Sequence, residues 1–155
     1  MQGSVKGEDV MPRASLPALA CYHIPMKGYL IDIEKETREN TDYRRVLYTG
    51  PRSQLVLMSL PPGVEIGEET HRADQFIRIE AGEGKAVLNG EEHMIKDGDA
   101  VVVPEGTRHN FINTGSTDLK LYTLYAPPQH EDGTIERTKA DEREEQWTGE
   151  TTEEA

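Results

Sequence analysis

The sequence predicts an all-β domain, built as a sandwich or barrel, on three observations. Short apolar or alternating segments recur about every 8–12 residues between positions 43 and 127. Turn signals separate them, among them Asn89-Gly90, a dipeptide typical of a two-residue β-hairpin. Only two segments have helical character, so the alternation of strands and helices found in parallel sheets is not expected.

The expected elements follow in chain order. A short charged helix is expected over Ile33–Asn40, and a second helix from about Lys139 to Trp147, where Thr138 could act as the N-cap. Between them, each strand is short and bounded by Gly, Pro, Asn or Asp. The predicted strands are Arg45–Tyr48, Gln54–Leu60, Glu65–His71, Gln75–Glu80, Gly84–Leu88, Glu92–Ile95, Ala100–Val103, His109–Ile112 and Leu119–Tyr125.

The 155 residues fit one domain with two polar ends. Residues 1–25 lack periodicity and are interpreted as a flexible arm, and residues 26–130 as the barrel. Residues 131–155 hold ten acidic and three basic side chains, which is typical of an acidic tail. We expect residues 148–155 to be disordered, with Trp147 docking on the body or on a partner subunit.

The charge and composition exclude several classes of protein. Seventeen Lys and Arg against 29 Asp and Glu give a net charge of −12, which disfavours nucleic acid and anionic membrane partners. No apolar run reaches the roughly 18 residues of a transmembrane helix. The single cysteine, Cys21, excludes a disulfide framework, and charged residues interrupt the segment before it, so an export signal is not expected. We therefore expect a cytoplasmic protein.

Polar side chains gather around one histidine of the central segment. Glu69 and His71 are two residues apart, so a strand would place both on one face. Gln75 opens the next predicted strand and would share its inner face with Ile77 and Ile79. Such groups are costly to bury without partners, and a divalent cation would supply one. On these residues alone, a polar cluster that satisfies itself without a metal is the alternative.

Two longer motifs in the sequence resemble those of the cupins, a family of small double-stranded β-helix (jelly-roll) barrels. Residues 98–113, GDAVVVPEGTRHNFIN, match the second cupin motif, G-x5-P-x-G-x2-H-x3-N, at every position. Residues 63–82, GVEIGEETHRADQFIRIEAG, match the spacing of the first, G-x5-H-x-H-x3,4-E-x6-G. The resemblance extends to a bacterial subgroup of single-domain cupins loosely labelled mannose-6-phosphate isomerase-like. It implies a cupin barrel and a homodimer.

The resemblance implies a metal site made by Glu69, His71, Gln75 and His109. Glu69 stands where a histidine is usual, and Gln75 stands where a glutamate is usual. Glu69, His71 and His109 would form a set of two histidines and one carboxylate, which suits Fe, Mn, Ni or Zn. Gln75 would be a weak fourth ligand or would bind a metal-bound water.

The inward strand positions predict a mostly apolar cavity beside the metal, with Tyr125 or Tyr48 as a proton donor. The predicted lining residues are Met58, Ile77, Ile79, Phe111, Leu121, Thr123 and Tyr125. His93 is expected on the surface of the hairpin, and His130 in an exposed loop after the barrel.

Two functions of different classes fit this reading. The first is a metal-dependent enzyme acting on a small organic substrate, with oxygenase chemistry as the first guess and isomerase or lyase chemistry as the second. The second is a non-catalytic module that binds or senses a small molecule, with a structural metal or none. A sugar-phosphate isomerase is disfavoured because Lys and Arg do not cluster. No catalytic side chain can be named from the sequence.

Overall fold

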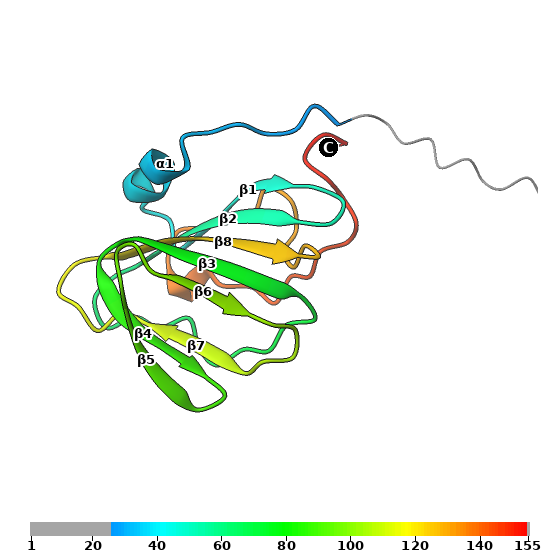
Figure 1. The fold of residues 1–155 in the computed structure, drawn as a ribbon. Helices are drawn as coiled ribbons and strands as arrows, with labels where there is room; N and C mark the ends of the chain where they lie inside the picture. The colour runs from blue at the N-terminus through cyan, green and yellow to red at the C-terminus, as the bar shows by residue number, and fades with distance from the viewer. Residues whose placement is uncertain (1–25, 155) are drawn as a thin grey trace, which may run out of the picture.

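Two antiparallel β-sheets make up the fold in the computed structural model, which describes residues 26–154 (Figure 1). The large sheet has the order β6 (Ala100–Val103), β3 (Asp74–Ala81), β8 (Leu119–Ala126), β2 (Gln54–Leu60), β1 (Arg44–Thr49) and β9 (Ile135–Glu136). The small sheet has the order β5 (Glu91–Lys96), β4 (Glu83–Leu88) and β7 (His109–Ile112). The predicted arm, residues 1–25, lies outside the described residues.

The predicted all-β class is confirmed, and most strand boundaries agree with the prediction within one residue. The exception is the predicted strand Glu65–His71, which forms only two isolated bridges to β7, at Glu65 and Glu69. The predicted hairpin is present between β4 and β5. Asn89 and Gly90 have φ values of 49° and 84°, the left-handed conformation that a tight two-residue turn needs.

The hydrophobic core lies between the two sheets and follows the alternation of the strands. On β3, Gln75, Ile77 and Ile79 are buried, while Phe76 is exposed on the other face. Phe111 of β7 and Leu121 of β8 join them, at 1% exposure each. For these strands, the sequence therefore correctly predicts which alternate side chains face the interior.

A short helix, α1 (Ile33–Glu39), packs near β8 and β3 at one end of the large sheet (Figure 1). Asp32 caps it, since its Oδ1 accepts a hydrogen bond from the N–H of Lys35 at 3.2 Å. Within residues 26–154, no helix has the length and apolar character needed to cross a membrane.

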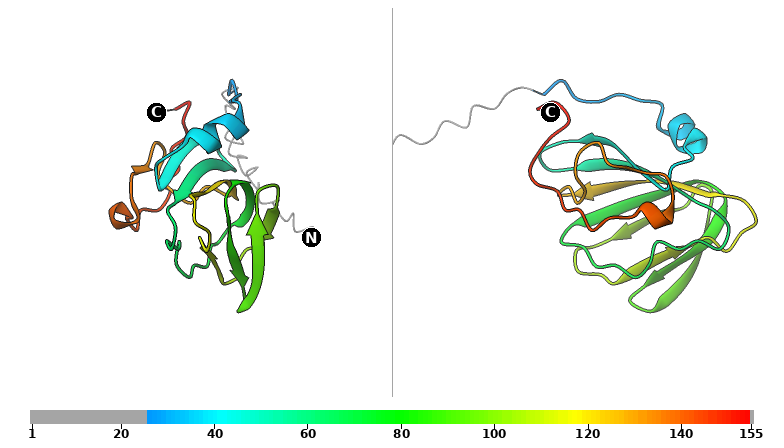
Figure 2. Two further views of the ribbon diagram at one scale, coloured as in Figure 1. Left: turned by 90° about the vertical axis from the view of Figure 1, so that its left-hand side faces the viewer. Right: turned by 180° about the vertical axis from the view of Figure 1, so that it is seen from behind.

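The second helix is much shorter than predicted. A single 3-10 turn, η1 (Lys139–Asp141), replaces the helix expected to run to Trp147. Beyond it the chain is extended, because its polar groups bond elsewhere: the N–H of Arg143 donates to Glu136, and that of Trp147 to the carbonyl of Gln129. The right-hand view of Figure 2 shows this segment running across the molecule.

Residues 148–154 are also placed, which contradicts the expectation of a disordered end. The N–H of Thr152 donates to the carbonyl of Thr49 at 2.9 Å, and Thr151 is buried. Glu153 accepts hydrogen bonds from the N–H groups of Lys27 and Gly28. The C-terminal segment therefore closes back onto β1 and the first described residues.

Candidate metal centre

The segment from Glu65 to Glu69 is held against β7. Glu69 and His109 exchange two backbone hydrogen bonds of 2.9 Å, which fixes the two residues side by side. Between the two bridges the chain bulges at Gly67, whose φ of 106° is unfavourable for other residues. The N–H of Gly67 donates to Oδ1 of Asn110 at 2.9 Å, which anchors the bulge. This irregularity explains why the predicted strand is not continuous.

The turn of the second motif ties the two halves of the site together. The N–H of Gly106 donates to the carbonyl of His71 at 3.0 Å, and the N–H of Thr107 closes the turn on Pro104 at 3.1 Å. Gly106 has a φ of 78°, which this turn requires. The turn holds the backbone of His71 and then leads directly into His109 at the start of β7.

The structure brings Glu69, His71 and His109 together. One donor atom from each lies within 4.8 Å of the others. Oε2 of Glu69 is 3.1 Å from Nε2 of His71 and 3.9 Å from Nε2 of His109. A carboxylate oxygen and two imidazole nitrogens are ligand types for divalent transition metals.

The Nε2 atom of His109 can offer a lone pair to a metal ion. Its Nδ1 lies 2.8 Å from the carbonyl of Thr107, so Nδ1 carries the proton and Nε2 is the free acceptor. Nε2 is buried and has no hydrogen-bond partner among residues 26–154. Burial, followed by the neighbouring His71, lowers the pKa of His109 and keeps the imidazole neutral, which metal binding needs. The donor set and this unpartnered nitrogen fit a bound cation.

Gln75 lies inside the barrel, where the sequence placed it. Its Nε2 donates to Oγ1 of Thr123 at 3.0 Å, which orients the amide. Its Oε1 is buried and has no hydrogen-bond partner in the described part of the chain. Gln75 pairs in register with Tyr125, whose ring packs edge-on against His71 at 5.4 Å. The side chain therefore has a free oxygen, and its role as a ligand stays a prediction.

The cavity beside these residues is polar, not apolar as predicted. It is open, with a volume of about 980 Å³, and is lined by residues 66–72, 127–130 and 142–147, with Arg44 and Lys139. The residues predicted to line it instead pack the interior of the barrel, each at 1% exposure or less. The apolar prediction failed because those side chains fill the space between the sheets, so the opening lies at the mouth.

Tyr125 and Tyr48, named as proton donors, lie in different places. Tyr125 is buried among the core residues, and burial raises the pKa of its hydroxyl. Tyr48 lies at the surface, where it donates to Glu153 at 3.1 Å. Of the two, only Tyr125 contacts a residue of the candidate site, namely His71.

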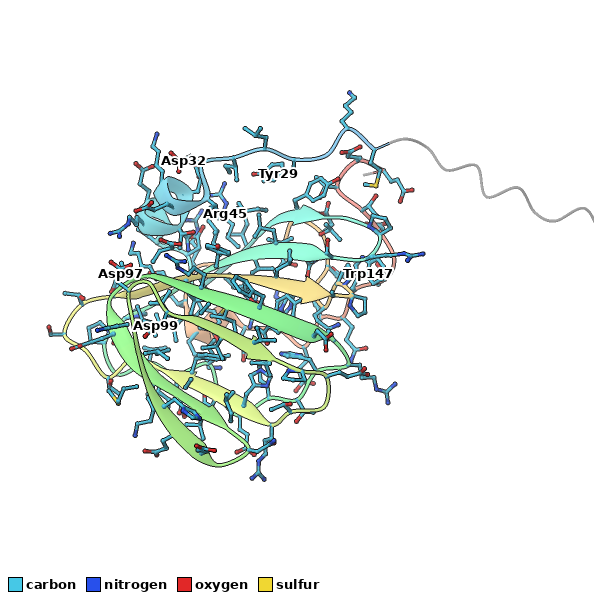
Figure 3. The ribbon with its side chains drawn as sticks, viewed as in Figure 1. Tyr29, Asp32, Arg45, Asp97, Asp99 and Trp147 are labelled. Carbon is cyan, nitrogen blue, oxygen red and sulfur yellow. The ribbon has the colours of Figure 1, made fainter. Side chains whose placement is uncertain are left out.

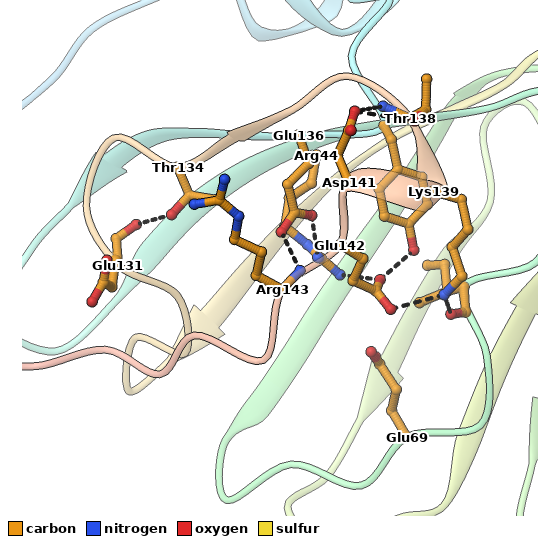
Figure 4. A network of polar contacts seen from close by, with 12 residues as sticks. Arg44, Glu69, Glu131, Thr134, Glu136, Thr138, Lys139, Asp141, Glu142 and Arg143 are labelled. Carbon is orange, nitrogen blue, oxygen red and sulfur yellow. Dashed lines mark hydrogen bonds and ion pairs between the residues drawn. The ribbon is translucent and has the colours of Figure 1, made fainter.

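A network of charged residues forms one wall of the cavity and was not predicted (Figure 4). Arg44, 2% exposed, binds Glu136 at 2.6 Å and Glu142 at 3.3 Å. Glu142 also accepts hydrogen bonds from Tyr43 and Lys139. Burial by itself would raise the pKa of Glu142, but these donors and Arg44 outweigh it and lower that pKa. The network fastens the C-terminal segment to β1.

Two other histidines were assigned to the surface, and one assignment is wrong. His93 is exposed on β5 as expected. His130 is instead part of the cavity wall, and its Nε2 is buried without a partner in residues 26–154. Burial, followed by the charge of Arg44, lowers the pKa of His130 to about 3. Trp147 lies by the end of β8 (Figure 3), because its backbone N–H donates to the carbonyl of Gln129, the residue before His130.

Comparison with known proteins identifies relatives of this chain. A family profile described as "Cupin domain" matches residues 56–125. The uncharacterized protein YrkC of Bacillus subtilis (strain 168) is 46% identical over 122 residues, which are 74% of this chain and 66% of that protein. The chain thus spans just under two thirds of the length of YrkC.

Solved structures agree with the fold. The crystal structure of BH2720 from Bacillus halodurans has a TM-score of 0.73 and 42% identity, covering 77% of this chain and 95% of that chain. An RmlC-like cupin family protein with a double-stranded β-helix fold, from Methanocaldococcus jannaschii, has a TM-score of 0.54 and 23% identity. The match covers 58% of this chain and 84% of the Methanocaldococcus jannaschii chain, and it concerns the fold alone.

Proposed function

The chain belongs to the cupin domain family, and from this premise we propose that it is a metal-dependent enzyme for a small organic substrate. Glu69, His71 and His109 would hold a divalent transition metal. The observation that carries the proposal is the meeting of their donor atoms within 4.8 Å, where the buried Nε2 of His109 has no partner in residues 26–154. A buried acceptor of this kind needs a ligand, and a cation fits it.

Gln75 would complete the site as a weak oxygen ligand. Its amide oxygen has no partner in the described part of the chain, and the hydrogen bond to Thr123 holds the amide in one orientation. An amide is a poorer ligand than the carboxylate usual at this position of the cupin motif. We therefore expect lower metal affinity than in a cupin with three histidines and a glutamate.

The ligand set suits Fe, Mn, Ni or Zn, and the supply in the cell decides among them. When bound, such an ion supplies Lewis-acid or redox chemistry. Oxygenase chemistry is the first reaction class to test, and isomerase or lyase chemistry the second. Glu69 would be occupied by the metal, so it is not available as a proton acceptor.

The cavity favours a small polar substrate over an apolar one. Carboxylate and cationic side chains line it together, and most cations are already paired: Arg44 with two glutamates and Lys139 with Glu142. Arg143 pairs with Glu145, so Arg72 is the one cation lining the cavity that has no ion pair within the described residues. This pairing leaves little positive charge for a phosphate, so a sugar-phosphate substrate is disfavoured.

Elemental analysis tests the proposal directly. Wild type, the double variant His71→Ala/His109→Ala and the control His93→Ala would be purified without added metal or chelator. We expect near-stoichiometric metal in wild type and in the control, and loss of the metal in the double variant. Equal metal content in all three proteins, or no uptake of any metal on titration, would overturn the proposal.

A non-catalytic binding module is the second candidate function. It is favoured by the 3.1 Å contact between Glu69 and His71, through which these two groups can satisfy each other without a metal. The protein, with or without a bound metal, should then bind small molecules in the cavity without turnover. Oxygen-uptake measurements on the iron form, together with isomerase and lyase screens on the zinc form, separate the two functions.

The homodimer remains a prediction. Apolar side chains of Phe76, Val102 and Leu124 are exposed at paired positions on the outer face of the large sheet. A second copy of the chain is the partner we expect, because isolated sheet faces of this kind are usually covered. Light scattering after gel filtration measures the mass directly, and a monomer of 17.4 kDa would refute the prediction.

A further inference from the structure

His130 is held rigidly in the wall of the cavity. Its N–H donates to Oε1 of Gln54 at 3.0 Å, and its carbonyl accepts from Nε2 of the same side chain at 2.7 Å. Gln54 lies on β2 and is fully buried. The backbone of His130 is therefore fixed by the core of the large sheet, although the residue follows β8 in a loop.

The imidazole of His130 lies near the candidate metal ligands without joining them. Its ring packs edge-on against Tyr125 at 5.3 Å, and Tyr125 in turn packs edge-on against His71 at 5.4 Å. One aromatic ring thus separates His130 from a candidate metal ligand. Glu69, His71 and His130 all line the same cavity. A molecule that reached the metal through this cavity would pass along His130.

The ring nitrogens of His130 lack hydrogen-bond partners among the residues that the structure describes. Nε2 is buried, and neither nitrogen makes a hydrogen bond within residues 26–154. Buried polar atoms in proteins are nearly always paired, so an unpaired one calls for a ligand or a water. The low pKa of His130 keeps the ring uncharged at neutral pH, so it can accept one hydrogen bond and donate another.

We propose that His130 is a ligand-contacting residue, which hydrogen-bonds the end of a small molecule whose other end binds the metal. The ligand class is a small compound with oxygen donors at one end and a hydroxyl or similar polar group at the other. This inference rests on the proposed metal site, since that site anchors the oxygen end. His130 would then select for the second polar group, and the metal for the first.

A matched pair of probes isolates this contact. Benzohydroxamate chelates divalent metals through two oxygens, and 4-hydroxybenzohydroxamate adds only a hydroxyl at the far end of the ring. The protein would be loaded with Co(II), whose visible absorption changes with its ligands. Dissociation constants would be measured for wild type, His130→Phe and the surface control His93→Phe. Phenylalanine keeps the edge-on packing against Tyr125 but has no hydrogen-bonding atom.

We expect the hydroxyl to strengthen binding about threefold to tenfold in wild type and in the control. In His130→Phe the two probes should bind equally well, and benzohydroxamate should bind as in wild type. His130→Gln restores a polar group and should recover part of the tighter binding of the hydroxylated probe. It replaces His130→Phe in the comparison if the phenylalanine variant does not fold.

Three outcomes would overturn the inference. An equal hydroxyl gain in His130→Phe and wild type, or no gain in wild type, refutes the role of His130 while leaving the metal site intact. Failure of wild type to bind Co(II) refutes the proposed function and this inference with it. Cobalt content, measured before each titration, tells these cases apart.

Discussion

Replacement of His109 by leucine should separate the stability of the metal-free protein from its response to metal. Leucine is close to histidine in volume and would still pack against Phe111, whose ring lies 6.1 Å from that of His109. The variant loses the hydrogen bond from Nδ1 to Thr107, which contributes about 0.5–1.5 kcal/mol. It also removes the buried Nε2, which has no partner within residues 26–154 and whose desolvation costs about 1–3 kcal/mol.

These two contributions oppose each other, so the free energy of unfolding of the metal-free variant should lie within about 1–2 kcal/mol of the wild-type value. The metal-bound state differs much more. A metal at 100 times its Kd stabilises wild type by about 2.7 kcal/mol, which corresponds to a rise in Tm of about 5–11 °C for a chain of this size. The variant should lose most of this rise, because one of three strong ligands is gone.

Differential scanning fluorimetry on chelator-treated protein, with and without Co(II), Mn(II) or Zn(II), measures both quantities. His93→Leu is the matched control, since His93 is exposed on β5 and remote from the cavity residues. The reasoning is refuted if His109→Leu retains the full metal-induced rise in Tm. It is also refuted if the metal-free variant unfolds far below wild type, because His109 would then be a structural residue.

Three further predictions concern stability. Arg44→Met should lower the free energy of unfolding, measured in urea, by about 3–5 kcal/mol, because it leaves the buried carboxylate of Glu136 without its cation. Adding Glu136→Leu should recover part of this loss. His130 has a pKa below its unfolded value of about 6.5, so the unfolded state binds the proton first as the pH falls. Its contribution to stability should therefore be present above pH 6.5 and fall by up to about 1.4 kcal/mol per pH unit toward pH 3. Urea unfolding at several pH values should show a shallower decline in His130→Gln, and parallel curves for the two proteins would contradict the assignment. Gly84→Ala would place a Cβ against the carbonyl oxygen of Ile112 in the paired strand, closer than van der Waals contact allows. We expect a loss of about 3 kcal/mol, and a Tm close to that of wild type would refute this.

Local patterns were sufficient to predict most of the fold. The alternation in Gln75–Glu80 sets which side chains face the core, because a strand has a period of two. The Asn89-Gly90 turn and the second motif set where chain reversals occur. The segment Glu65–His71 was harder, because its bulge at Gly67 depends on a hydrogen bond to Asn110, a residue 43 positions away.

The C-terminal segment shows where local rules fail. Thr138 and the acidic residues after it favour a helix, and one turn does form. The helix then stops, because the side chain of Glu142 binds Tyr43 and Arg44, which lie almost 100 positions earlier in the chain. These long-range contacts outweigh a helix propensity that is small per residue.

The sequence by itself determined the all-β class and eight of the nine strands, β1 to β8. Through the resemblance of its motifs to those of the cupins, it also named the three residues that converge at the candidate metal site, together with Gln75. The spacing and types of these residues can be read locally, because the two sequence motifs contain all of them. Only the tertiary structure decided what surrounds Glu69, His71 and His109: the polar cavity, the buried network around Arg44 and the inward position of His130. Those features depend on which distant segments pack together, and side-chain burial is set by that packing rather than by sequence pattern.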